Sequence, residues 1–257
     1  MRFSASLRVA AFIAFLPVAT NAADPEIAVR VDGYLGYGNL DLFLFEEDAF
    51  QGGGSGSVSA VFDAFYVQAD VFGDVMDFEG SLEARNVGPG LHLGWRDPDR
   101  GSAGVVGTYG HLDLGVDSLD VYRAGVEGEI YLDRLTMGLS GGYLDFSGAD
   151  LAYLDVRLGF YPVERLRLGI RVGADGVEES NPQFGLGLDA AVLATRTVVP
   201  FLRWEASLPT RFSRVVQHSL AAGLALYWGE AESSLRARDR NAFNRPCRGL
   251  LVVGRLC

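Results

Sequence analysis

Apolar and polar side chains alternate with a period of two along most of the chain, from about residue 26 to residue 228. In the run 122–132, the even-numbered residues are apolar or small and the odd-numbered ones are mostly polar or charged. The same alternation recurs over 152–161, 166–173 and 184–190. Successive side chains of a β-strand point to opposite faces, so each run predicts a strand with one apolar and one polar face.

Turn-forming residues separate these runs, which predicts that consecutive strands are hairpin neighbours. The predicted turns lie at Gly38-Asn39, Gly73-Asp74, Asp97-Pro98-Asp99, Asp133-Arg134, Ser147-Gly148, Tyr161-Pro162, Asn181-Pro182 and Pro209-Thr210. Twelve strands are predicted, at 26–37, 40–45, 57–72, 78–95, 102–112, 119–132, 135–146, 150–160, 165–175, 183–194, 198–207 and 214–228. An even number of strands, most of them near the 9–11 residues that cross a bilayer, predicts an all-β fold: a single antiparallel up-and-down transmembrane β-barrel.

The second strand, 40–45, is the weakest part of this assignment. The glycine-rich link Gly52–Gly56 that would follow it is unusually long for a turn, so ten strands is the alternative. In the second half of the chain, tight links at 133–134 and 195–197 alternate with longer ones. Short turns on one side of a membrane and longer loops on the other are typical of a membrane barrel.

The two ends of the chain differ from its middle. Residues 1–22 combine Arg2 and Arg8 with an apolar core and end in small residues, the order that is typical of a secretory signal peptide. We therefore predict a signal peptide at 1–22, the barrel at 23–228 and an arginine-rich periplasmic extension at 229–257.

The predicted extension holds the only two cysteines, Cys247 and Cys257. The periplasm is oxidising, so a disulfide between them is predicted. Two free thiols or a cross-link to another chain are the alternatives.

The last predicted strand ends in Tyr227-Trp228. It resembles the aromatic-ended final strand of Gram-negative outer-membrane β-barrels, a porin-like class, and the resemblance covers residues 26–228. It implies a place in the cell outer membrane, contact with outer-membrane lipids and recognition by the barrel-assembly machinery. One departure is that 29 residues follow Trp228, where this class usually ends the chain.

Alternation alone is equally compatible with a secreted soluble β-barrel or sandwich that binds a small apolar ligand, with the two faces exchanged. Composition favours the membrane. All 22 basic residues are arginine, and lysine is the usual residue of a water-exposed surface. Aromatic residues such as Trp95, Tyr109 and Trp228 also lie near the ends of apolar faces, where a membrane barrel carries its interfacial girdles.

In a membrane barrel the polar face lines the lumen. The predicted lumen charges are Arg123, Glu127, Glu129, Asp155, Arg157, Arg167, Arg171, Asp175, Asp189, Arg203 and Glu205. Arginines and carboxylates at this density can pair across the interior, which predicts a narrow or plugged pore for passive permeation or envelope integrity. Residues 23–229 contain 14 arginines and 30 acidic residues, so cations should pass more readily than anions.

No catalytic residue, cofactor or metal site is predicted. The segment 185–190 has the spacing of a dinucleotide fingerprint, but strand alternation continues where that motif needs a helix. His92, His111 and His218 lie on different predicted strands without ligand spacing. The net charge of −11 gives no reason to expect nucleic-acid binding. A lipid hydrolase of the outer membrane is a less favoured alternative.

Overall fold

The computed structural model describes residues 25–42, 45–78, 83–115, 117–146, 149–176, 183–208, 216–229 and 234–241. These residues form the strands β1 (Glu26–Leu42), β2 (Phe45–Phe62), β3 (Phe65–Phe78), β4 (Glu83–Asp97), β5 (Gly101–Asp113), β6 (Ser118–Leu132), β7 (Leu135–Phe146), β8 (Ala149–Val163), β9 (Leu166–Asp175), β10 (Gln183–Val192), β11 (Val198–Leu208) and β12 (Val216–Trp228), and the helix α1 (Leu235–Asn241). The predicted signal peptide and both cysteines lie outside the described residues.

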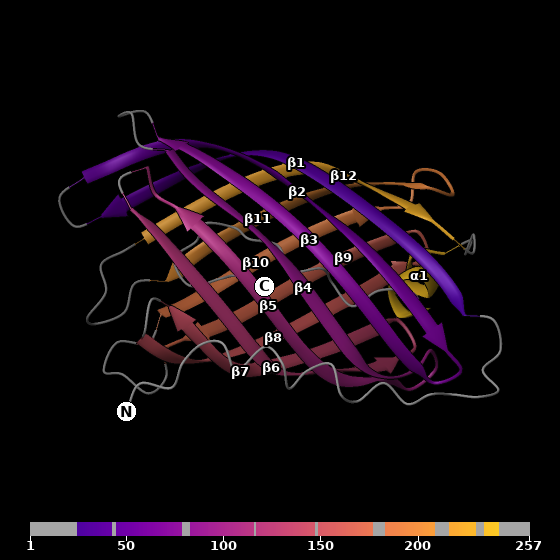
Figure 1. Ribbon diagram of the computed structural model, residues 1–257. Helices are drawn as coiled ribbons and strands as arrows, with labels where there is room; N and C mark the ends of the chain where they lie inside the picture. The colour runs from indigo at the N-terminus through magenta and orange to yellow at the C-terminus, as the bar shows by residue number, and fades with distance from the viewer. Residues whose placement is uncertain are drawn as a thin grey trace, which may run out of the picture.

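The strands close into a single barrel (Figure 1). Each pairs antiparallel with its neighbours in sequence, and β1 pairs with β12 from Val29 opposite Trp228 to Asp41 opposite Val216. Every strand therefore has two hydrogen-bonded partners, as spanning a bilayer requires. The predicted all-β, antiparallel barrel of 12 strands is confirmed.

The first quarter of the chain differs from the prediction. β1 continues through Gly38-Asn39, and the Gly52–Gly56 segment lies inside β2, where it pairs with β1 on one side and β3 on the other. A strand at 40–45 followed by a glycine-rich link is therefore wrong, and the predicted strand 57–72 is divided by a turn at Asp63-Ala64.

Close packing explains why the glycine-rich segment lies inside β2 and not in the predicted link. A Cβ atom on Gly53 would lie 2.7 Å from the carbonyl oxygen of Gly73 and 2.9 Å from the Tyr34 hydroxyl. Glycine in a strand often marks such a close approach, and the approach depends on residues distant in sequence. Local sequence alone therefore favoured a turn.

The remaining predicted turns divide into three groups. Those at 97–99 and 133–134 are confirmed. Gly73-Asp74 lies within β3, and Tyr161-Pro162 lies within β8 at a register shift that accommodates the proline. Three lie outside the described residues: Ser147-Gly148, Asn181-Pro182 and Pro209-Thr210.

One end of the barrel carries the short turns 63–64, 98–100, 133–134 and 164–165, together with the start of β1 and the end of β12. Asp63 and Asp133 adopt φ angles of 51° and 35°, a region that aspartate tolerates better than most residues and that tight hairpins require. Short turns and both strand termini mark the periplasmic end of a bacterial barrel. α1 lies at this end (Figure 1).

Apolar side chains face outward and polar side chains face the lumen. On β8, Leu154 is 47% exposed while its neighbour Asp155 is 4% exposed. A water-soluble barrel would bury its apolar face instead, so the soluble alternative is excluded. Exposed aromatic residues lie near both rims, with Tyr37 and Tyr122 toward the outer end and Trp95 and Trp228 toward the periplasmic end, as interfacial girdles do. No helix in the described part of the chain is long and apolar enough to span a membrane.

Inside the barrel, apolar and charged side chains occupy different levels along the lumen. Toward the outer end, an apolar cluster joins five strands and consists of Phe72, Val106, Val121, Leu144 and Tyr153. At the periplasmic end, a second cluster packs Leu235 of α1, which is completely buried, against residues that include Tyr161, Phe201 and Tyr227. Charged side chains lie between these clusters.

Candidate functional site

The candidate site is the charged middle of the lumen together with α1. The 11 predicted lumen charges all occupy the inward-facing set of alternate strand positions on β6, β8, β9, β10 and β11. Arg123, Asp155, Arg167 and Glu205 are at most 8% exposed. Glu127, Glu129, Arg157, Arg171, Asp175, Asp189 and Arg203 are partly buried.

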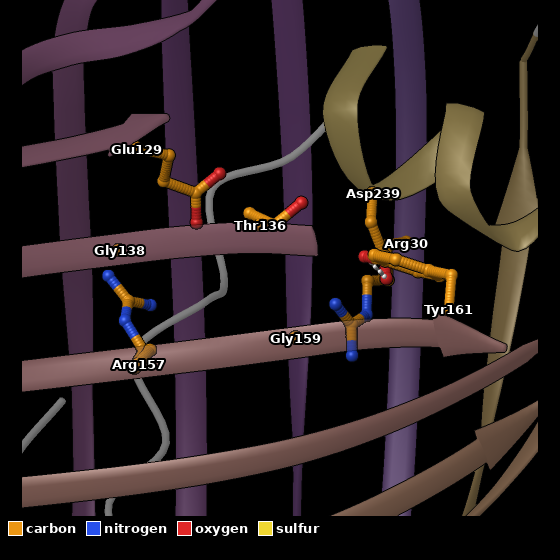
Figure 2. Close-up of a pocket in the computed structure, with 8 residues that line it drawn as sticks. All are labelled: Arg30, Glu129, Thr136, Gly138, Arg157, Gly159, Tyr161 and Asp239. Carbon is orange, nitrogen blue, oxygen red and sulfur yellow. Dashed lines mark hydrogen bonds between the residues drawn. The ribbon is translucent and has the colours of Figure 1, made fainter. Parts of the chain in front are cut away.

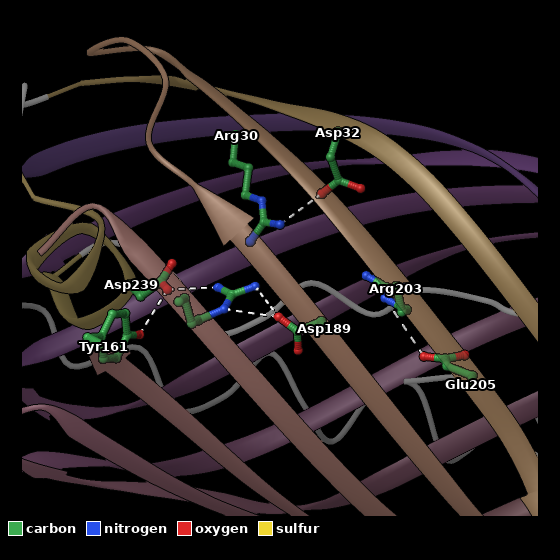
Figure 3. Close-up of polar contacts among 8 residues, drawn as sticks. Arg30, Asp32, Tyr161, Asp189, Arg203, Glu205 and Asp239 are labelled. Carbon is green, nitrogen blue, oxygen red and sulfur yellow. Dashed lines mark hydrogen bonds and ion pairs between the residues drawn. The ribbon is translucent and has the colours of Figure 1, made fainter. Parts of the chain in front are cut away.

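Arg167 on β9 pairs with two carboxylates, those of Asp189 and Asp239, which are both labelled in Figure 3. Its Nε and Nη2 atoms donate to one carboxylate oxygen of Asp189 at 3.1 and 2.9 Å, and its Nη1 donates to Asp239 at 2.7 Å. The Tyr161 hydroxyl donates to the same oxygen of Asp239 at 2.9 Å. Asp239 belongs to α1, so one guanidinium joins the helix to two strands of the barrel wall.

Further pairs line the neighbouring wall. Asp155 accepts from Arg171 at 2.5 Å and lies 3.5 Å from Arg157, so one carboxylate serves two arginines. Arg203 and Glu205 lie 3.8 Å apart on β11 (Figure 3). Arg123 stacks over the Tyr153 ring, with 3.7 Å between the guanidinium carbon and the ring centroid. Both charge signs are thus compensated inside the lumen, as burial of charge requires.

Sequence reasoning missed a second polar cluster, formed by β3, β4 and β6. His92 lies between Asp70 and Glu127, 2.9 Å from each, and Glu127 also accepts from the Tyr66 hydroxyl at 2.9 Å. His111 and His218 are exposed on the outer face. The histidines do not meet, and in the described ranges no group of three or more His, Cys, Asp or Glu side chains could hold a metal ion.

The first strand adds two more buried charges. Arg30 pairs with Asp32 at 3.2 Å, with side chains 5% and 0% exposed. Tyr34 donates to Asp74 on β3. The sequence placed Asp74 in a turn, and only the β2–β3 register reveals that it points inward.

α1 is a short helix that closes on the periplasmic mouth. It begins after Ser234, whose hydroxyl accepts from the Ala237 amide at 3.0 Å in a helix N-cap. Arg240 donates to the Asp133 carbonyl at 2.7 Å, and Arg236 lies 3.3 Å from the Asp133 carboxylate. Arg238 donates to the Arg196 carbonyl on another turn. The helix is therefore tied to two periplasmic turns as well as to Arg167.

A small cavity lies beside α1 within the lumen (Figure 2). Its volume is about 20 Å³, and its lining comes from both sides of the barrel: Arg30, Glu129, Thr136, Gly138, Arg157, Gly159, Tyr161 and Asp239. Such a space holds about one water molecule. Next to the helix, the side chains of opposite walls nearly meet.

No family model and no curated protein matches this sequence. Solved structures do match in fold. An outer membrane channel from Pseudomonas putida F1 has a TM-score of 0.60 and 9% identity, over 83% of this chain and 99% of that one. The translocator domain of autotransporter NalP from Neisseria meningitidis has a TM-score of 0.55 and 11% identity, over 81% and 90%. Outer membrane phospholipase A from Escherichia coli has a TM-score of 0.50 and 14% identity, over 76% and 92%.

These three proteins share a fold but, by their names, not a function. Fold similarity at this level of identity therefore identifies an architecture, and function must be argued from the lumen itself. With its lipid-compatible outer face and closed strand pairing, this chain is an outer-membrane β-barrel with the fold of small channels and autotransporter translocators.

Proposed function

We propose that this protein is a passive channel of the outer membrane that rests closed. The observation that carries the proposal is the position of Asp239, which places α1 inside the periplasmic mouth and is bound there by Arg167 and Tyr161. Eight strands enclose only enough space for side chains, and sixteen leave a water-filled channel. A barrel of 12 strands has an intermediate width, so an inserted helix and paired charges decide whether it conducts.

The paired charges support a narrow path rather than a wide one. Arg167, Arg171 and Arg203 each contact a carboxylate on their own or a neighbouring strand. Such pairs fix the positions of long side chains that face the lumen. The apolar cluster around Leu144 narrows the outer half in the same way, and hydrophobic constrictions restrict the passage of water and ions.

A role in envelope integrity alone would use the same architecture but would give no conductance when α1 is released.

We also propose that the protein is not an enzyme. The lipid-hydrolase alternative is tested directly by incubating the purified protein with phospholipid or lipopolysaccharide and measuring release of fatty acid.

Conductance in planar bilayers tests the channel. The full chain should show small, weakly cation-selective openings at most. Asp239→Lys, which replaces attraction to Arg167 by repulsion, should increase the conductance or the frequency of opening, and Asp239→Asn should do so to a smaller extent. Asp133→Asn is the matched control because it removes an exposed contact of the same helix.

Two results would contradict the proposal. Large, stable, nonselective openings of the full chain would show that the lumen is not constricted. The second is a lack of conductance in Asp239→Lys, which would show that α1 does not close a conducting path. Circular dichroism and gel mobility without heating would first show that this variant is folded.

A further inference from the structure

The place where α1 is held has the chemistry of a carboxylate-binding site. Arg167 Nη1 and the Tyr161 hydroxyl converge on one oxygen of Asp239, at 2.7 and 2.9 Å. Both donors are nearly buried, Arg167 at 8% and Tyr161 at 2% exposure. Hydrogen bonds between ionised partners are the strong ones in proteins, and exclusion of water strengthens them further.

Other donors border the same space. Arg30 and Arg157 line the cavity next to Asp239, from opposite walls of the barrel (Figure 2). The Arg30 Nε and Thr136 Oγ1 atoms are buried and make no hydrogen bond within the described part of the chain. Arg30 itself is 4% exposed. The cavity therefore offers further donors that Asp239 does not use.

We propose that a small carboxylate solute competes with Asp239 for Arg167 and Tyr161, and that this competition releases α1 from the periplasmic mouth. The inference rests on the proposed channel and deepens it by naming the solute class that opens it. Asp239 then acts as a tethered substitute for the carboxylate of the solute. The cavity of about 20 Å³ leaves room for only about one water molecule beside Asp239, so a solute must take the place of the Asp239 carboxylate, and solutes with one or two carboxylates and few other atoms fit best.

The surrounding acids keep such binding weak. Asp189 already occupies Nε and Nη2 of Arg167, and Glu129 lines the cavity. Weak binding keeps the release of α1 reversible, because Asp239 can return to Arg167 and Tyr161 when the solute leaves.

Tryptic cleavage of the full chain in detergent measures release of α1, since the helix contains three arginines and Arg238 is 3% exposed. Cleavage within α1 is followed by mass spectrometry, with sodium acetate or sodium succinate compared with sodium chloride at equal ionic strength. We expect the carboxylates to accelerate cleavage by roughly tenfold, which corresponds to about 1.4 kcal/mol. Tyr161→Phe should reduce this acceleration, because one donor to the carboxylate is lost.

Variants separate this inference from the channel itself. Asp239→Asn should be cleaved rapidly without any carboxylate, while Asp133→Asn should still respond to acetate. Equal acceleration by chloride would overturn the inference, because simple screening of ion pairs would explain it. The inference would also be overturned if carboxylates did not change the cleavage rate of the unmodified chain while Asp239→Asn was cleaved rapidly. In that case the proposal of a closed channel would stand. Slow cleavage of Asp239→Asn together with its silence in bilayers would remove both proposals.

Discussion

His92 on β4 and Glu127 on β6 lie 2.9 Å apart although β5 separates their strands. The other ring nitrogen of His92 lies 2.9 Å from Asp70 on β3, so one imidazole connects three strands inside the lumen. All three side chains are at most 8% exposed. Two buried carboxylates thus share one partner, which makes this cluster sensitive to substitution.

Replacement of His92 by alanine should destabilise the barrel strongly. Removing one partner of a buried charged pair typically costs about 3–5 kcal/mol, because the charge that remains loses its oppositely charged partner. Urea unfolding in detergent, followed by tryptophan fluorescence, measures the change. His218→Ala is the control, since His218 is exposed and stacks on Trp204 with ring centroids 6.1 Å apart. Equal stability of the two variants would show that the His92 cluster does not hold the strands together.

Glycines of β2 should differ in their tolerance of a methyl group. A Cβ on Gly53 would meet the Gly73 carbonyl and the Tyr34 hydroxyl, whereas one on Gly56 would meet only Val71, at an ordinary 3.5 Å. Overpacking costs about 1–3 kcal/mol. We expect Gly53→Ala to lower the urea midpoint and Gly56→Ala to leave it nearly unchanged. The reverse order would contradict the packing of β2 against β1 and β3.

The sequence predicted the barrel well because alternation is a local signal that survives without knowledge of the neighbours. Runs such as 122–132 and 135–146 coincide with β6 and β7 to within a few residues. The prediction is wrong at positions where residues distant in sequence determine the local structure. Gly52–Gly56 has the composition of a loop, yet it forms the middle of β2, where Gly53 leaves space for Tyr34 and Asp74. Asp74, assigned to a turn for the same reason, was lost from the predicted lumen charges.

The candidate site was predicted only in part, for a related reason. The 11 expected charges face inward because strand parity follows directly from sequence. The hydrogen-bond and ion-pair partners of these charges do not follow from strand parity. Asp239 lies 72 positions from Arg167 in sequence, in a tail where periodicity gave no signal for a helix of seven residues. Only three-dimensional register shows that this tail returns to the barrel mouth.

Arginine at position 126 should impair assembly. Val126 is 63% exposed on the outer face of β6, midway between Tyr122 and Ile130. Arginine facing lipid near the midplane costs about 2–4 kcal/mol in barrels of this kind. Heat-modifiable mobility on gels reports the folded fraction after refolding into lipid vesicles. Val126→Leu is the matched control and should refold normally, whereas equal folding of both variants would contradict the lipid-facing assignment.

Ion preference should follow the acids that line the path beside α1. Glu129 is on the cavity wall and points into the lumen from β6 (Figure 2), so its charge acts on any ion that passes the released helix. In a background of Asp239→Lys, which removes the block, Glu129→Gln should shift the reversal potential in a potassium chloride gradient toward weaker cation preference. Glu164→Gln is the control, because Glu164 lies on an exposed periplasmic turn with its side chain 67% exposed. Interactions of exposed charges are weakened by solvent and salt, so this second change should leave the potential nearly constant. An identical shift in both variants would mean that overall charge, not the lining of this constriction, sets the selectivity.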